Sequence, residues 1–211
     1  MRDQGGESSG DLDLQLLSAV VSQGSFELGP LDHHFRWGEP VWLSGRNGCG
    51  KSTLLLALAG LLPRRKGVIQ LGGECLSSAT RTVDPKLRHC AILLQDLGLW
   101  PHMSISAQCR LMSPTANDTI DRWSEKLGLN HYLDRLPADL SGGQAQRAAL
   151  MRTLCTDAQW YLLDEPYSAQ HQEGEALINS VLCELAESRG LIVAGHRPLP
   201  DARSIELTDP E

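Results

Sequence analysis

The sequence of 211 residues lacks several features that would define a class of protein. No apolar run approaches the roughly 20 residues that a membrane-spanning helix needs, so we expect no such helix. None of the six cysteines forms a C-x-x-C pair, which argues against a zinc site and favours reduced thiols over disulfides. Aromatic residues are also scarce, at 5%.

An excess of positive charge is missing as well. The chain has 19 Lys and Arg against 26 Asp and Glu, whereas binding along a nucleic-acid backbone normally needs a basic excess. We therefore expect no nucleic-acid partner, and we interpret the basic run Arg64-Arg65-Lys66 as a solvated turn. Residues 1–11 predict a flexible tail that is too polar for a signal peptide, so we expect a cytoplasmic protein.

What the sequence does contain is a glycine-rich segment between a predicted strand at 41–44 and a predicted helix from Lys51 to near Gly60. This is the context of a phosphate-binding loop. Its glycines can turn successive N–H groups toward one anion, Lys51 would reach the β- and γ-phosphates, and Ser52 would bind Mg2+. The predicted nucleotide-binding residues are Gly45, Arg46, Asn47, Gly48, Cys49, Gly50, Lys51, Ser52 and Thr53.

Apolar runs of strand length alternate with helical patterns along the chain. We expect strands near 12–21, 26–37, 67–71, 90–94, 160–163 and 191–194, and helices at 117–127, 141–155 and 173–188. Such alternation predicts an α/β fold with a mostly parallel sheet whose ligand groups lie at the carboxyl ends of its strands. Four polar side chains occupy those positions, namely Gln95, Asp164, Glu165 and His196.

These motifs, in this order, resemble those of the nucleotide-binding subunit of an ABC transporter, which is a P-loop ATPase. The segment Leu140-Ser141-Gly142-Gly143-Gln144 is identical to the family signature L-S-G-G-Q, and Gln95 falls at the family's Q-loop. The segment 162–166 matches the magnesium-binding strand with its catalytic glutamate, and His196 matches the switch histidine. The resemblance implies one domain over 12–207, with a P-loop NTPase core, a small antiparallel β subdomain and a helical insert at about 96–155.

The resemblance also implies a role for each motif. ATP and Mg2+ are the expected ligands, with Ser52, Gln95 and Asp164 at the metal. The expected catalytic residues are Glu165, His196, Gln95 and Lys51. The residues Ser141, Gly142, Gly143 and Gln144 are expected to contact nucleotide bound by a second ATPase subunit, most simply a second copy of the chain.

The sequence departs from the family pattern at three places. Where the family has S-x-L-D, this chain has Ser168-Ala169-Gln170-His171, so the aspartate that helps to couple two sites is absent and a histidine there could add pH dependence. No aromatic residue for adenine stacking lies within Val20–Gly24, Phe26 being the nearest, which predicts weak discrimination among nucleotides. Cys49 lies within the phosphate-binding loop. We expect alkylation of its thiol to inhibit the protein and bound nucleotide to protect the thiol from alkylation. The alternative is that Cys49 is only a small residue in a tight turn.

The favoured function is the ATPase subunit of a transporter, peripheral on the cytoplasmic face of the inner membrane, with separate membrane-spanning subunits contacted by residues 95–104 and the insert. That contact segment resembles bacterial importers, whereas the short chain and His196-Arg197-Pro198-Leu199 resemble a haem-exporter ATPase, so direction stays open. The alternatives are a non-transport ABC ATPase of DNA repair or translation, and a non-catalytic nucleotide-binding module, against which Glu165 argues.

Overall fold

The computed structural model describes residues 12–113 and 117–208, so the predicted tail at 1–11 lies outside the described residues. The strands are β1 (Leu14–Gln23), β2 (Phe26–Phe35), β3 (Val41–Ser44), β4 (Arg64–Leu71), β5 (Glu74–Ser77), β6 (Cys90–Leu93), β7 (Trp160–Asp164), β8 (Gly190–Ala194) and β9 (Arg203–Glu206). The helices are α1 (Lys51–Leu58), α2 (Ile105–Met112), α3 (Asn117–Lys126), α4 (Gly142–Leu154) and α5 (Gln172–Ala186).

A parallel sheet with the order β6-β7-β8-β3-β9 crosses the middle of the molecule. Its central strands are buried on both faces, and alternate residues of β7 enter two different cores. Trp160 and Leu162 pack with α1, whereas Tyr161 and Leu163 pack with the other helices. The predicted α/β fold with a mostly parallel sheet is therefore confirmed.

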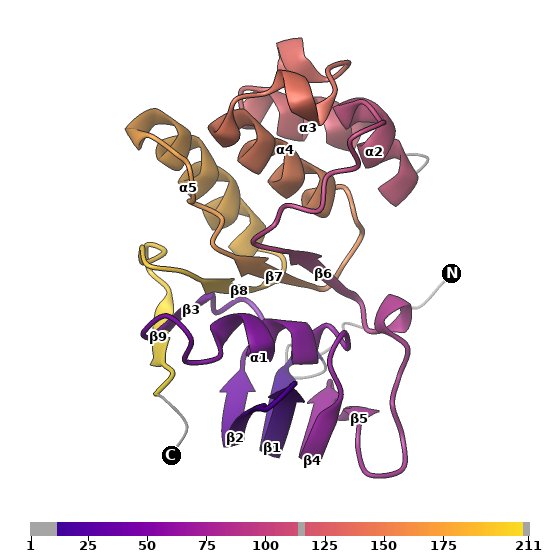
Figure 1. Cartoon of the computed structure of the whole chain (residues 1–211), viewed down its shortest axis with the longest axis vertical. Coiled ribbons are helices and arrows are strands. Elements are labelled where there is room, and N and C mark those ends of the chain that lie inside the picture. Colours follow the sequence, from indigo (N-terminus) through magenta and orange to yellow (C-terminus); the bar gives the residue numbers. More distant parts are fainter. Residues whose placement is uncertain (1–11, 114–116, 209–211) are drawn as a thin grey trace, which may run out of the picture.

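A second, antiparallel sheet has the order β2-β1-β4-β5. Helix α1 lies between the two sheets (Figure 1). Its buried residues include Leu54, Leu55 and Leu58, and they join side chains of both sheets in one core. The expected small antiparallel β subdomain is thus present, and it holds the helix that follows the glycine-rich segment.

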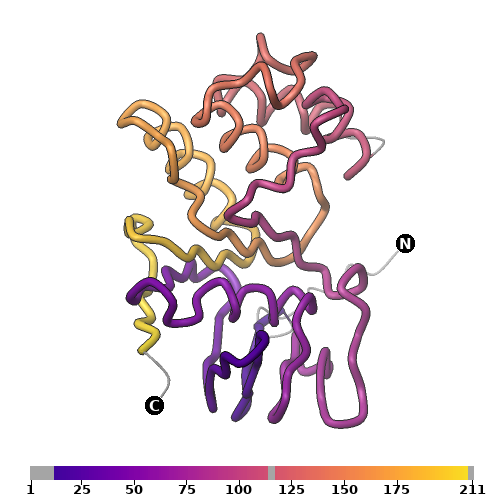
Figure 2. Tube along the Cα trace, viewed as in Figure 1, coloured from indigo at the N-terminus to yellow at the C-terminus, as the bar shows by residue number. Residues whose placement is uncertain are grey.

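The other four helices cover the opposite face of the parallel sheet. Figure 2 shows the chain leaving the sheet after β6, passing through α2 and α3, and returning along α4 into β7. The pattern of Ile120 and Trp123 that predicted α3 is buried as expected. Within residues 12–113 and 117–208, no helix is both long and apolar enough to cross a bilayer.

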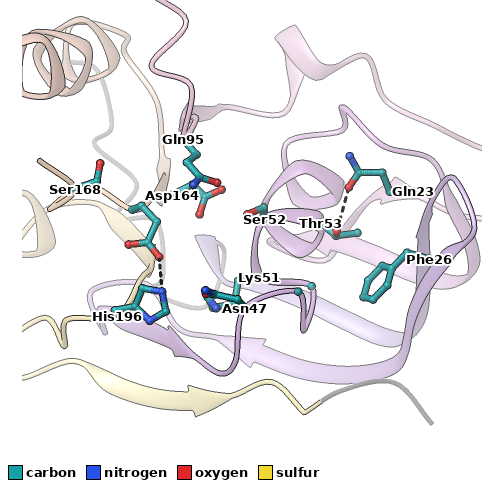
Figure 3. Close-up of a pocket in the computed structure, with 13 residues that line it drawn as sticks. Gln23, Phe26, Asn47, Lys51, Ser52, Thr53, Gln95, Asp164, Ser168 and His196 are labelled. Atoms are coloured by element: carbon teal, nitrogen blue, oxygen red, sulfur yellow. Dashed lines mark hydrogen bonds and ion pairs between the residues drawn. The ribbon is translucent and has the colours of Figure 1, made fainter. Parts of the chain in front are cut away.

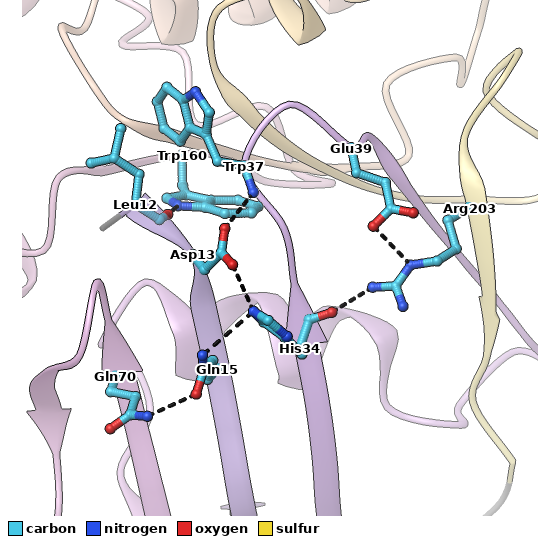
Figure 4. Close-up of polar contacts among 9 residues, drawn as sticks. All are labelled: Leu12, Asp13, Gln15, His34, Trp37, Glu39, Gln70, Trp160 and Arg203. Atoms are coloured by element: carbon cyan, nitrogen blue, oxygen red, sulfur yellow. Dashed lines mark hydrogen bonds and ion pairs between the residues drawn. The ribbon is translucent and has the colours of Figure 1, made fainter. Parts of the chain in front are cut away.

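A polar network fastens the two sheets together at their far end (Figure 4). Asp13 accepts hydrogen bonds from the Trp37 backbone N–H at 2.8 Å and contacts His34 Nε2 at 2.7 Å. The Trp37 ring packs edge-on against Trp160, 6.3 Å between centroids. Arg203 of β9 donates to the His34 carbonyl at 2.6 Å. These contacts join the two sheets at the amino-terminal ends of the strands β7 and β9.

Some expectations about the elements were wrong or incomplete. The run Arg64–Lys66 is not a turn but the start of β4, because Arg64 and Lys66 pair with Val21 and Val20 of β1. Helix α2 and the strands β5 and β9 were not predicted. The exposed edge strand β9 has only Ile205 as a partly buried residue, so its pattern is weak.

The buried side chain of Arg88 fixes the end of α1. It is 1% exposed and donates to the carbonyls of Ala57 and Leu58 at 3.1 and 3.2 Å. Its other N–H groups donate to the carbonyls of Val83 and Leu76 at 3.1 and 3.4 Å. A guanidinium can donate hydrogen bonds to the last carbonyls of a helix, and its positive charge is favourable at the negative end of the helix dipole.

We predict that Arg88→Met lowers the free energy of unfolding by about 2 to 4 kcal/mol, because several buried carbonyls lose their donors together. Urea unfolding followed by circular dichroism measures this change. The matched control is Lys86→Met, since the Lys86 side chain is 76% exposed; we expect it to stay within about 0.5 kcal/mol of the parent. Equal effects of the two substitutions would contradict the role given to Arg88.

Candidate functional site

The register of the parallel sheet brings four loops together at one edge. Ala194 of β8 pairs with Leu43 of β3 on one side and with Asp164 of β7 on the other. Leu163 of β7 pairs in turn with Leu93 of β6. The loops that follow these strands therefore begin next to one another, as expected for the carboxyl edge of a parallel sheet.

These loops enclose a cavity of about 600 Å3. It is lined by Gln23, Phe26, Asn47, Gly48, Gly50, Lys51, Ser52, Thr53, Gln95, Asp164, Glu165, Ser168 and His196. Six of the nine residues of the glycine-rich segment are in that set, together with all four polar residues predicted from the strand ends. Sequence reasoning did not single out Gln23, whose only signal was its position as the last residue of β1, before the turn to β2.

The glycine-rich segment has the conformation that its glycines were expected to permit. Gly45, Gly48 and Gly50 have φ of 140°, 86° and 102°, a region that other residues rarely adopt. At Gly45 the backbone also passes so close to its surroundings that a Cβ atom would lie 2.5 Å from the Leu207 carbonyl oxygen. Gly50 is the N-cap of α1, so the positive end of that helix opens into the cavity.

Lys51 lies folded over the glycine-rich segment. Its Nζ donates to the carbonyls of Gly45 and Arg46 at 2.9 and 3.1 Å, and the residue is 8% exposed. An ammonium group has three donors, and these two carbonyls accept from two of them. Lys51 lines the cavity beside Asn47 (Figure 3). The cavity is consequently positive on the side formed by α1.

Asp164 and Ser52 face each other across the floor of the cavity. The residue Asp164 is 4% exposed, and burial raises the pKa of its carboxyl, against the opposing effects of a hydrogen bond from Ser52 and the charge of Lys51. A buried carboxylate of this kind is stabilised by a cation. Among the described residues no three His, Cys, Asp or Glu side chains gather as a metal site, so a bound cation would also need hydroxyl or amide oxygens.

Glu165 and His196 form the side of the cavity opposite α1. His196 Nε2 lies 3.7 Å from Glu165 Oε1, and the two side chains are 61% and 21% exposed. The Glu165 N–H donates to the Ala194 carbonyl at 2.8 Å, which joins the start of the Glu165 loop to the end of β8, close to His196. At Gly195 a Cβ would lie 3.2 Å from Glu165 Oε2, so the glycine admits the carboxylate to this position.

Gln23 and Phe26 lie at the other end of the cavity, beyond the glycine-rich segment (Figure 3). The Thr53 hydroxyl donates to Gln23 Oε1 at 3.2 Å, which leaves the amide N–H groups of Gln23 as the available donors. The Phe26 ring approaches Gly50, where a Cβ would lie 3.2 Å from Phe26 Cε1. The cavity is thus polar and charged at one end and carries one aromatic ring at the other.

Of the two interpretations of Cys49, the structure favours a small residue in a tight turn over a thiol that nucleotide would protect. Its side chain is 1% exposed and belongs to the core between the two sheets, and it does not line the cavity. The side chain points away from the cavity because Cys49 lies in the turn between Gly48 and Gly50, where its N–H donates to the Arg46 carbonyl at 3.3 Å. The thiol is therefore a small buried residue in a tight turn, and protection by nucleotide is no longer expected. Gly45 and Arg46 also lie outside the cavity lining.

The predicted residues Ser141 to Gln144 are not part of this cavity. They line a separate hollow of about 470 Å3 with residues of α5. Ser141 caps α4 by accepting from the Gln144 N–H at 3.3 Å, while Gln144 Oε1 accepts from the Ser141 N–H at 2.9 Å. This reciprocal capping box fixes the start of α4, where Gly142 is exposed and Gly143 is partly buried.

A family model described as "ABC transporter" matches residues 28–168. The chain belongs to the ABC transporter family. The matched stretch contains the glycine-rich segment, Gln95, the turn at Ser141 and the pair Asp164 and Glu165.

Individual ABC proteins are similar over different parts of the chain. An sn-glycerol-3-phosphate import ATP-binding protein of Agrobacterium fabrum is 39% identical over 145 residues, 65% of this chain and 38% of that protein. A thiamine import ATP-binding protein of Vibrio vulnificus is 34% identical over 189 residues, 85% of this chain and 78% of that protein. The chain spans less than half the length of the first of these relatives.

Solved ABC structures share the fold. A dimeric bacterial ABC transporter cassette superposes with a TM-score of 0.80 at 21% identity and covers 92% of this chain and 94% of that chain. A bacterial Atm1-family ABC exporter with ATP bound superposes with a TM-score of 0.82 at 22% identity and covers 99% of this chain and 39% of that chain. At such identities the likeness concerns the fold, an ABC ATPase cassette with a P-loop core.

Proposed function

We propose that the chain binds ATP in the large cavity, hydrolyses it, and drives transport through separate membrane-spanning subunits. The observation that carries this proposal is the convergence of Lys51, Asp164, Glu165 and His196 on one cavity at the N-terminus of α1. A helix N-terminus with a lysine at one side and carboxylates at the other suits a triphosphate and its cation.

The glycine-rich segment would hold the phosphates. Backbone N–H groups of residues 45–53 and the positive end of α1 favour an anion. Lys51 now donates to two carbonyls of the same segment, and a phosphate oxygen is a stronger acceptor for an ammonium than a neutral carbonyl. Binding would therefore draw Lys51 off the carbonyls and onto the β- and γ-phosphates.

The residues present fit Mg2+. Ser52, Gln95 and Asp164 supply hydroxyl, amide and carboxylate oxygens to one cavity, which is the hard-ligand set that Mg2+ takes. Burial raises the pKa of the Asp164 carboxyl, and a bound cation would favour its charged form. When bound, Mg2+ would neutralise charge on the phosphates; the protein groups would orient it.

Catalysis would depend on the groups opposite Lys51. Glu165 is placed to orient or deprotonate the attacking water, His196 to donate to the γ-phosphate, and Gln95 to sense the water or metal at the end of β6. Hydrolysis of a phosphoanhydride mainly requires positioning and charge stabilisation. Each of these side chains lines the same cavity, which supports the assignment.

The residues Ser141 to Gln144 would act on a second subunit. Their separation from the large cavity supports the proposal that they face nucleotide bound by another copy, so that two chains close over two ATP molecules. We further propose that residues 12–207 act as one ATPase domain, with its helical part at about 96–155.

Import is the transport direction that we propose. The two similar proteins described above are import ATP-binding proteins, and this favours an importer-like ATPase over the haem-exporter alternative. The partner would be a membrane protein contacted by residues 95–104 and the helical part, which places the chain on the cytoplasmic face of the cell membrane. We propose no nucleic-acid partner, because the net charge is -7.

Phe26 and Gln23 are predicted to bind the nucleotide base weakly. A single phenyl ring and two amide donors suit any purine, so we expect GTP to compete with ATP within about fivefold of equal affinity. Phe26→Ala should weaken ATP binding about fivefold, while Ser25→Ala, in the exposed turn, should not. Competition titrations with a fluorescent nucleotide measure both, and a strong preference for ATP would refute weak discrimination.

Glu165→Gln should abolish ATP turnover and retain ATP binding, because the amide keeps the shape of the carboxylate and removes its basicity. We expect a loss of at least about 100-fold in kcat, measured as phosphate release. The control is Glu187→Gln, an exposed change at the end of α5, which should leave kcat unchanged. Unchanged hydrolysis in Glu165→Gln would overturn the assignment and favour a different base.

Transport is tested by what the Glu165→Gln variant binds in its native cell. We expect a polytopic membrane protein to co-purify after mild detergent extraction with ATP and Mg2+, since a chain that cannot hydrolyse ATP should stay in its closed complex. Lys51→Ala serves as the control and should recover much less partner. Recovery with ribosomes or DNA instead would support the non-transport alternative.

A further inference from the structure

The loop that follows β7 is fastened to α4 at two points. At the first point Gln146 Nε2 donates to the Glu165 carbonyl at 3.1 Å, and the Ser168 hydroxyl donates to Gln146 Oε1 at 2.9 Å. Gln146 is 2% exposed, so these hydrogen bonds are shielded from water. The start of the loop, next to the Glu165 side chain, is thereby held against the middle of α4.

The second point is Gln170, the first residue at which the chain departs from S-x-L-D. Its Nε2 donates to the Gly143 carbonyl at 2.9 Å, and its Oε1 accepts from Arg147 Nη1 at 2.8 Å. Arg147 Nε donates in turn to the Leu127 carbonyl at 2.9 Å. Both ends of the amide are therefore used, and they tie the loop to the first turn of α4.

Neighbouring glycines make room for this amide. A Cβ at Gly174, in the first turn of α5, would lie 2.2 Å from Gln170 Oε1 and 2.9 Å from Arg147 Nη1. A Cβ at Gly143 would lie 3.0 Å from the Ala169 carbonyl oxygen. Glycine weakens a helix, so a glycine at 174 is explained by the side chain that it admits.

The loop itself has a backbone that needs such support. Glu165 and Ala169 have φ of 50° and 58°, values that are uncommon for residues other than glycine and that persist where surrounding contacts impose them. The hydrogen bonds of Gln146 and Gln170 are those contacts. Two sets of hydrogen bonds therefore tie this loop to α4, one at Gln146 beside the Glu165 backbone and one at Gln170 beside Gly143.

We propose that Gln170 is a positioning residue for the turn Ser141–Gly143. The proposal rests on the proposed function, in which this turn contacts nucleotide on a second copy. The leucine of the family pattern could neither donate to Gly143 nor accept from Arg147. Gln170 instead links the turn to the loop that carries Glu165 within one chain, where the aspartate that couples the two sites is replaced by His171.

The test compares Gln170→Leu with Gln172→Leu, the same change at an exposed position two residues along. The readout is hydrogen–deuterium exchange at the backbone amides of Gln144 and Ala145. These amides donate hydrogen bonds to the Ser141 hydroxyl and the Ser141 carbonyl, respectively. We expect Gln170→Leu to speed exchange there on the order of tenfold and to leave the amides of β8 unchanged. Equal exchange in the two variants would overturn the proposal.

A second variant reaches the same contact without changing Gln170. Gly174→Ala fills the space that the amide occupies, so it should also speed exchange at Gln144 and Ala145, although alanine favours helix. If Gly174→Ala leaves exchange at these amides unchanged, Gln170 does not hold the turn through this contact and the proposal fails.

The functional arm uses chains that also carry Glu165→Gln, and it measures ATP-driven pairing by light scattering. With Gln170→Leu the ATP concentration for half-maximal pairing should rise about tenfold relative to Gln172→Leu, while ATP binding by the single chain stays the same. If Gln170→Leu speeds exchange at Gln144 and Ala145 but leaves the ATP concentration for pairing unchanged, Gln170 has only a structural role. That result would overturn its role as a positioning residue. If no variant pairs, the proposed pairing fails, and the exchange result still decides whether Gln170 holds the turn.

Discussion

The parallel pairing of β6, β7, β8 and β3 determines where the loops that carry Gln95, Asp164, Glu165, His196 and the glycine-rich segment meet. One row of the sheet contains Asp164, Ala194 and Leu43. Two of the loops begin directly after Asp164 and Ala194, and the third begins after Ser44, one residue beyond Leu43. A shift by one residue would turn the side chains of β7 to opposite faces, which would move Asp164 out of the cavity and exchange the two cores. The apolar residues of the strands therefore fix the catalytic geometry as firmly as the polar residues do.

Helix α1 connects the two sheets to the place where the proposed nucleotide would bind its phosphates. Its side chains are buried between two sheets, its first residue is Lys51, and Arg88 holds the carbonyls at its other end. A helix that is fixed at both ends presents its N–H groups at a constant position, so little reorganisation is needed when an anion binds. This arrangement explains why Arg88 is buried at the end of α1 that lies away from the cavity.

Much of this arrangement could be predicted from the sequence, because local patterns report local structure. The apolar runs predicted β3, β6, β7 and β8, and their order predicted that Gln95, Asp164 and His196 would meet. The outward-facing β9 and the partners of Arg64 could not be predicted, since they depend on pairing with distant strands. The burial of Cys49 depends on the direction of one side chain in a tight turn, which composition does not reveal.

The cavity is asymmetric, and that asymmetry has a consequence for recognition. Charged groups line the end near Glu165 and Lys51, whereas the other end offers one phenyl ring and one amide, Phe26 and Gln23. Charge-assisted hydrogen bonds are about twice as strong as neutral ones, so most of the binding energy would come from the phosphates and their cation. In the proposed function, such a site would distinguish a triphosphate from a diphosphate more sharply than one base from another, because the γ-phosphate would lie at the end that holds the fixed charges.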